Sequence, residues 1–178
     1  MEKNDSATKM RIFKTAVIFV FAVCLLLMRV YEPHFKALSS GARTLDMSFH
    51  SSAEVFKLFD TLGIQGRLLY IRLLLIDFIF IASFALVQNF ILKFVMGRAL
   101  LKTGWRRMLA ISYLRGLLDV IENISLLILI NSFPLKTPWL AAFSSFFTTL
   151  KFIFLGLWLI SIPILYIIRI KKREKSSK

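Results

Sequence analysis

Four long apolar stretches constrain this chain more strongly than any other feature of its sequence. They cover residues 12–30, 68–94, 108–130 and 138–168. A helix that crosses a bilayer needs about 20 mostly apolar residues, at a rise of about 1.5 Å each. No strand-like alternation competes with this pattern. We therefore predict an all-α fold, in which residues 1–178 form a single membrane domain built as an integral membrane four-helix bundle.

The first stretch has two interpretations. Its uninterrupted apolar core, residues 16–28, is short enough to suit a cleaved signal peptide. However, the small-residue sites at which cleavage would occur, near Ser39 and Ala42, lie rather far downstream. We interpret the stretch as an uncleaved helix, with Lys14 and Arg29 reaching the two membrane interfaces.

The basic residues are divided unevenly between the two ends of the predicted bundle. The chain has 24 Lys and Arg against 10 Asp and Glu, a net charge of +14. Fifteen of these basic residues precede the first stretch, surround the second connection or follow the fourth stretch, whereas the other two connections carry only Lys36, Arg43, Lys57 and Lys136. Because cytoplasmic loops are enriched in Lys and Arg, both termini are predicted to be cytoplasmic, with a basic tail over residues 169–178. Membrane topology thus explains the positive charge without a nucleic-acid partner.

The first connection, residues 31–66, contains its own helix signal. Ser51 and Glu54 have the spacing of a capping box, in which each side chain satisfies a free backbone N–H. Apolar residues then follow at helical spacing, and Gly63 is suited to end the helix. We predict an extracytoplasmic amphipathic helix over about residues 52–62. It would lie either on the outer membrane surface or over the bundle as a lid.

Six ionisable residues lie inside the apolar stretches, where a charge costs free energy unless it is paired or functional. They are Arg72, Asp77, Arg115, Asp119, Glu122 and Lys151. Counting the rise per residue from the helix ends puts Asp77, Asp119, Glu122 and Lys151 in a similar layer of the membrane. Arg115, Asp119, Glu122 and Asn123 also share one helix face. We therefore predict that Asp77, Asp119, Glu122, Asn123 and Lys151 form a polar core and are the candidate catalytic residues.

Several functions are compatible with such a core. It could fix helix register through buried ion pairs. Alternatively it could bind or modify a lipid or another amphiphile, because carboxylates that share a site can hold a proton for acid–base chemistry. A proton-coupled carrier or channel component, or a structural subunit whose polar stripe serves a partner helix, remain alternatives. An oligomer or a partner membrane protein is compatible with each of these functions. The residues do not indicate a particular reaction.

A second group of polar residues lies where the second helix enters the membrane. Arg67 is predicted at headgroup depth, where a guanidinium can bind phosphate in a forked geometry or act as an anchor. Tyr70 is assigned to the interfacial aromatic belt. Together with Arg72 and Arg115, these two residues are the candidate ligand-binding residues.

These motifs resemble a pattern in an uncharacterised family of four-span membrane proteins, mainly bacterial. The matching segments are Gly63-Ile-Gln-Gly66-Arg67-Leu-Leu-Tyr70 followed by Asp77, then Asp119-Val-Ile-Glu122-Asn123, and then Lys151. The resemblance covers roughly residues 50–155 and implies a plasma (cell inner) membrane location, but no known activity. Here Ile81-Ala-Ser83 stands where the family pattern has a proline-containing step.

The sequence carries none of the common catalytic or cofactor motifs. It has no Gly-rich phosphate loop, no serine nucleophile elbow and no zinc spacing. Cys24 is the single cysteine, and His34 and His50 are the only histidines. No metal and no cofactor are predicted.

Overall fold

The computed structural model describes residues 2–176 and, within them, four long helices and no β-strand. The all-α prediction is confirmed. Two short 3₁₀ segments, Leu45–Met47 and Gly104–Leu109, lie in the first and second connections. The helices are α1 Glu2–Leu38, α2 Ser52–Leu101, α3 Ala110–Ser132 and α4 Pro138–Ser176. Of the basic residues counted above, Lys178 and the side chains of Lys3, Arg173 and Lys175 lie outside the described residues.

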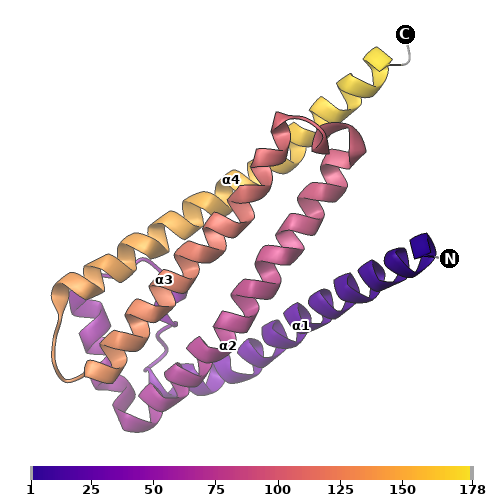
Figure 1. Ribbon diagram of the computed structural model, residues 1–178. Helices are drawn as coiled ribbons and strands as arrows, with labels where there is room; N and C mark the ends of the chain where they lie inside the picture. The colour runs from indigo at the N-terminus through magenta and orange to yellow at the C-terminus, as the bar shows by residue number, and fades with distance from the viewer. Residues whose placement is uncertain (1, 177–178) are drawn as a thin grey trace.

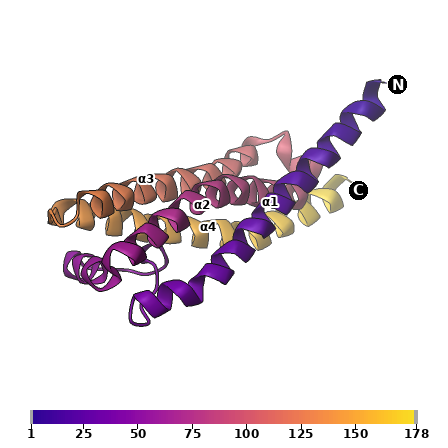
Figure 2. The ribbon, with the colours of Figure 1, turned by 90° about the horizontal axis from the view of Figure 1, so that it is seen from below.

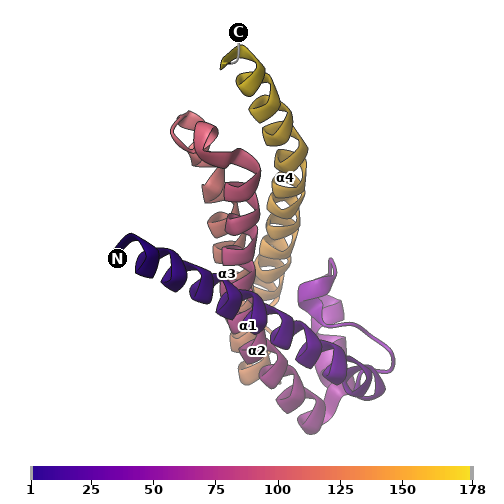
Figure 3. The same ribbon diagram turned by 90° about the vertical axis from the view of Figure 1, so that its right-hand side faces the viewer.

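Three of these helices, α2, α3 and α4, run alongside one another, whereas α1 crosses α2 at an angle (Figures 1 and 3). The packing of α1 is mainly against α2, and its N-terminal half diverges from the other helices (Figure 2). Both ends of the described chain lie at the same end of the molecule as the α2–α3 connection (Figure 1). The α1–α2 and α3–α4 connections lie at the opposite end. An even number of long antiparallel helices produces this arrangement.

The exterior of the described chain is apolar and its interior holds many polar side chains. Phe19, Leu26 and Ile160 are 59–68% exposed. Three helices in the described part are long and apolar enough to cross a membrane, within Asp5–Leu38, Ser52–Arg98 and Pro138–Lys172. The remaining helix, α3, has 23 residues and carries Arg115, Asp119 and Glu122. An apolar exterior of this extent indicates an integral membrane protein, since water-soluble monomers rarely expose such surfaces.

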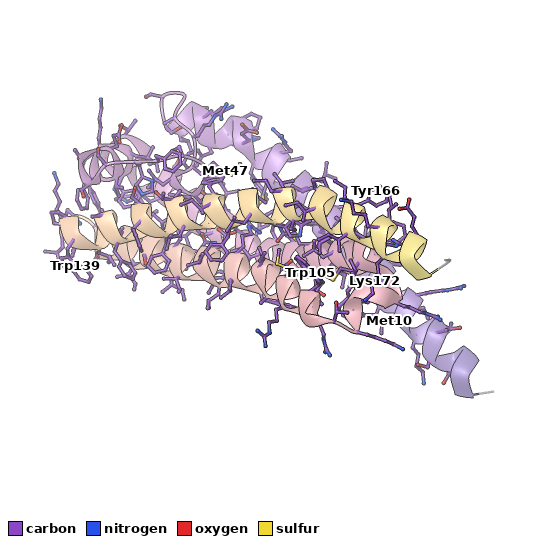
Figure 4. The ribbon with its side chains drawn as sticks, turned by 90° about the horizontal axis from the view of Figure 1, so that it is seen from above. Met10, Met47, Trp105, Trp139, Tyr166 and Lys172 are labelled. Carbon is purple, nitrogen blue, oxygen red and sulfur yellow. The ribbon has the colours of Figure 1, made fainter. Side chains whose placement is uncertain are left out.

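Large aromatic side chains mark both ends of the molecule. Figure 4 shows Trp139 at one end, and Trp105 and Tyr166 toward the other with Lys172. All three aromatic rings are exposed. Trp139 and Tyr166 are separated by 27 residues of α4, about 40 Å at helical rise, which is close to the thickness of a bilayer with its headgroups. Their positions are those of the aromatic belts that flank membrane spans.

The first eleven residues of α2 form a separate helical arm. The predicted capping box is present: Ser51 Oγ accepts from the Glu54 N–H, and the Ser51 N–H donates to Glu54 Oε2 at 2.6 Å. At Gly63 the backbone adopts φ 59° and ψ −168°, so the helix is kinked there. This is a positive-φ break but not the left-handed helical conformation that ends many helices. α2 therefore continues beyond Gly63 in a new direction.

The apolar face of this arm packs on the bundle. Val55, Phe59 and Leu62 are buried in one cluster with residues of α1, α3 and α4, while Lys57 and Asp60 are exposed. Of the two predicted placements, these contacts favour a lid over the bundle. At its C-terminal end, Arg67 Nη1 donates to the Phe59 carbonyl at 3.0 Å. The guanidinium thereby satisfies an acceptor next to the Gly63 kink.

A second glycine kinks α2 near its other end. Gly97 has φ 59° and ψ −178°. Arg169 of α4 lies against it and donates to the carbonyls of Phe94 and Val95 at 3.0 and 3.1 Å. A Cβ at Gly97 would lie 3.1 Å from Arg169 Nε. The position therefore requires glycine for both its backbone conformation and its contact with α4.

We expect Gly97→Ala to lower the stability of the protein by about 1–3 kcal/mol, because it strains a positive-φ residue and displaces Arg169. Thermal unfolding in detergent micelles, followed by circular dichroism, measures this change. Gly156→Ala is the matched control, since no atom lies within 4 Å of its new Cβ in α4. It should leave stability unchanged or raise it slightly. Equal effects of the two substitutions would contradict the assigned role of Gly97.

Candidate functional site

The inner faces of α2, α3 and α4 meet in a group of buried polar side chains, called here the polar cluster. Each member is at most 6% exposed. The members are Asp77 of α2, Arg115, Asp119, Glu122 and Asn123 of α3, and Thr148 and Lys151 of α4. Their contacts show that these side chains face inward and meet in one cluster. Helical periodicity alone accounts for the α3 set, because residues four, seven and eight positions apart share a face.

Lys151 is the central contact of the polar cluster. Its Nζ lies 2.7 Å from Asp119 Oδ1 and 2.7 Å from Glu122 Oε2. Asp119 also receives a hydrogen bond from Arg115 Nη2, at 2.6 Å from its Oδ2. The carboxylate of Asp119 thus contacts a cation through each oxygen. Buried charges of this kind are tolerated only when they are paired and hydrogen-bonded.

Two uncharged side chains each donate one hydrogen bond to a remaining carboxylate. Thr148 Oγ1 donates to Glu122 Oε1 at 2.6 Å. Asn123 Nδ2 donates to Asp77 Oδ2 at 2.6 Å. The first bond joins α4 to α3, and the second joins α3 to α2. Thr148 was not among the predicted site residues, although the sequence places it on the same face of α4 as Lys151.

Small and aromatic residues position the charged ones. A Cβ at Gly116 would lie 3.4 Å from that of Ala85, so the glycine gives α3 a close approach to α2. The Arg115 guanidinium lies over the Phe84 ring, 4.4 Å from its centroid. This cation–π contact stabilises a guanidinium that is removed from water.

Arg72 does not join the polar cluster. Its side chain is exposed, on the opposite side of α2 from Asp77. The six ionisable residues inside the apolar stretches comprise three acids and three bases. The structure brings together Asp77, Asp119 and Glu122 with only Arg115 and Lys151. One acid is therefore in excess.

Tyr70 does not lie on the exposed surface of the protein. It is fully buried, packs against Phe35 at 5.3 Å between ring centroids, and accepts a hydrogen bond from the Leu45 N–H at 2.9 Å. Tyr70 thereby holds the Leu45–Met47 turn against the bundle. Arg67 is half-buried and lies over the Phe133 ring, 4.7 Å from its centroid. These two candidate ligand-binding residues lie outside the polar cluster.

A partly open cavity of about 370 Å³ lies between α1, α2 and the Leu45–Met47 turn. Asp77 lines it, so the cavity borders the polar cluster. Apolar side chains from both helices, including Leu25, Leu74 and Phe80, form much of the remaining wall. Asp46 of the turn also lines the cavity, and the sequence analysis missed it. The position of Asp46 depends on the hydrogen bond from the Leu45 N–H to Tyr70, and the sequence around Asp46 gives no sign of this contact.

Further polar groups follow the cluster toward the α2–α3 connection. Gln88, Asn89 and Ser112 are at most 1% exposed. Asn89 Nδ2 donates to the Leu109 carbonyl, but both side-chain heteroatoms of Gln88 and the Ser112 hydroxyl have no partner among the described residues. Buried polar atoms of this kind usually bind internal water.

The histidines and the cysteine contribute nothing to the polar cluster. His34 is exposed, and His50 is buried with Nδ1 3.0 Å from the Ser48 carbonyl oxygen. Cys24 is buried in α1. Among the described residues, no group of three His, Cys, Asp or Glu side chains is arranged to hold a metal ion.

Comparison with known proteins finds no relative: no family model, no curated protein and no solved structure matches this chain. The fold and the site define a helical protein with three candidate membrane spans and a buried charged cluster. The resemblance to an uncharacterised four-span family stays a prediction.

We expect Lys151→Met to destabilise the protein by about 3–5 kcal/mol, because it leaves a buried carboxylate without its cation. Adding Glu122→Gln removes that carboxylate charge, while Arg115 still pairs with Asp119. The double variant should therefore be more stable than Lys151→Met alone. Chemical unfolding of the wild type, both single variants and the double variant measures the coupling. Additive losses would show that Lys151 and Glu122 do not stabilise each other.

Proposed function

We propose that this chain is a four-span membrane protein, with both termini in the cytoplasm, that binds a lipid or another amphiphile in the cavity between α1 and α2. The proposal has three parts: the number of spans, their orientation, and the ligand.

The fourth span is α3. Its charged residues point into the bundle and are paired there, while Leu117, Ile124 and Ile128 on its outer side are 47–56% exposed. A helix whose ion pairs are satisfied internally presents an apolar surface to its surroundings. A criterion based on sequence alone counts those charges as if they faced the lipid, and so it does not select α3. Because the charges are paired inside the bundle, we treat α3 as a span.

The orientation rests on the basic residues at one end of the molecule. Lys9 and Arg11 precede the apolar part of α1, Arg106 and Arg107 lie in the α2–α3 connection, and Lys171 lies near the C-terminal end of α4. All three segments lie at the same end (Figure 1). The positive-inside rule assigns that end to the cytoplasm, and so the cavity lies toward the outer leaflet.

The single observation that carries the ligand proposal is the cavity itself. It combines an apolar wall with a buried carboxylate, Asp77, at the edge of the polar cluster. Ligand sites typically have this character: mostly hydrophobic surfaces with a few placed polar groups. An amphiphile fits such a cavity because its apolar chain can pack against the apolar wall while its polar head contacts the carboxylate.

A proton-coupled carrier is the second candidate, and the polar groups beyond the cluster favour it. Gln88 and Ser112 lie between Arg115 and the proposed cytoplasmic end, where internal water bound to them would extend the polar path. A structural role toward a partner helix has less support, since α2, α3 and α4 already supply one another with polar partners.

We expect Leu25→Trp to weaken amphiphile binding at least about tenfold, because the larger ring would occupy the cavity that Leu25 lines. Mono-oleoylglycerol is a suitable uncharged probe, and native mass spectrometry of the detergent-solubilised protein measures its retention. Leu26→Trp is the matched control, since this neighbour is 65% exposed and does not line the cavity. Unchanged binding by Leu25→Trp would contradict the proposed site.

A further inference from the structure

The charge balance of the polar cluster singles out Asp77. Arg115 and Lys151 are paired with Asp119 and Glu122, so two cations balance two carboxylates. Asp77 is the third carboxylate, and its one hydrogen-bond partner among the described residues is the uncharged amide of Asn123. Because Asp77 is 6% exposed, its ionised form has little access to water. A carboxylate in this position needs a proton or an external cation.

Asp77 has a second carboxylate near it on the same cavity. Asp46 is half-buried on the Leu45–Met47 turn, lines the cavity, and interacts electrostatically with Asp77 and Lys151. Neither Asp46 nor Asp77 forms an ion pair with another described residue. The Tyr70 hydroxyl accepts a hydrogen bond from the Leu45 N–H, which holds the turn in place. The two carboxylates thus line one cavity from different elements, and Lys151, whose charge acts on both, makes its ion pairs with Asp119 and Glu122 instead.

The remaining charges on the cavity wall are differently arranged. Arg29 and Glu32 of α1 pair with each other at 3.2 Å, and Lys36, which does not line the cavity, adds a second cation to Glu32 at 2.7 Å. Arg43, in the connection after α1, is exposed. This part of the wall therefore has excess positive charge, in contrast to the Asp46–Asp77 part. The apolar residues Leu25 of α1 and Phe80 of α2 lie closer to the middle of the bundle than Arg29 and Asp77 on the same helices.

We infer that the cavity binds an amphiphile whose head carries an ammonium group, with the ammonium between Asp77 and Asp46 and the apolar chain against Leu25 and Phe80. This inference rests on the proposed function of the cavity. An ammonium neutralises the excess carboxylate and donates hydrogen bonds to it. Two kinds of ligand carry this chemistry: a long-chain amine, and a zwitterionic phospholipid whose phosphate would lie near Arg43.

The test compares four probes whose apolar chains are monounsaturated and of the same length. Oleylamine and oleoyl lysophosphatidylethanolamine carry an ammonium, oleoyl lysophosphatidylglycerol carries a phosphate without one, and mono-oleoylglycerol is uncharged. Their affinities for the full-length protein in mild detergent are measured by native mass spectrometry. At least one ammonium probe should bind about tenfold tighter than mono-oleoylglycerol, a difference of about 1.4 kcal/mol. Tight binding of only the amine identifies a long-chain amine, and tight binding of the phospholipid identifies a zwitterionic head.

Variants separate the role of Asp77 from that of the cavity. Asp77→Asn should abolish the preference for ammonium, so that the ammonium probes bind this variant no more tightly than mono-oleoylglycerol binds it. Asp46→Asn, on the turn outside the helices, should reduce the preference and provides a second measurement if Asp77→Asn fails to fold. The matched control is Asp60→Asn, because Asp60 is exposed on the helical arm and does not line the cavity.

The possible results distinguish this inference from the proposed function. Equal affinity for all four probes, or an ammonium preference that persists in both Asp77→Asn and Asp46→Asn, would overturn the inference and leave the amphiphile site intact. Tightest binding of lysophosphatidylglycerol would likewise overturn it, in favour of an anion at Arg43. If no probe binds, the proposed function fails as well.

Discussion

The contact of Lys151 with both Asp119 and Glu122 is the interaction on which the rest of the structure depends. A protein interior surrounded by hydrocarbon offers no bulk water to an unpaired charge, so each buried cation must meet its carboxylates within the bundle. This requirement fixes the axial position of α4 relative to α3. The Asn123–Asp77 hydrogen bond then fixes α2, and Gly116 gives it the close approach that such a bond needs.

The two ends of the bundle are held by different means. At the end with the helical arm, buried aromatic residues pack together and Arg67 donates to the Phe59 carbonyl. Tyr70 accepts the hydrogen bond that positions the Leu45–Met47 turn. At the other end, Arg169 binds the carbonyls beside the Gly97 kink. α1 packs mainly on α2. The cavity lies at this α1–α2 boundary, where the packing is least constrained by ion pairs.

Much of the polar cluster could be predicted from the sequence because it depends on local periodicity. The rise per residue gives the depth of Asp77, Glu122 and Lys151, and the helical repeat gives their faces. The rest depends on contacts between distant segments. Arg72 and Phe80 lie about two turns apart on α2. Only the packing of this helix decides that Arg72 faces outward while Phe80 lines the cavity. Nothing near Asp46 indicates that Tyr70 holds its turn against the bundle, and so the cavity could not be predicted.

The central claim is that a helix with three buried charges crosses the membrane because those charges are neutralised inside the bundle. Its most direct test is the environment of α3. Nitroxide labels at Leu117, Ile124 and Ile128, which are exposed on its outer side, would be compared in nanodiscs by collision with oxygen and with a water-soluble nickel chelate. If α3 spans the bilayer, all three labels collide with oxygen far more than with nickel. Strong nickel collisions at all three positions would place α3 in water and contradict this account.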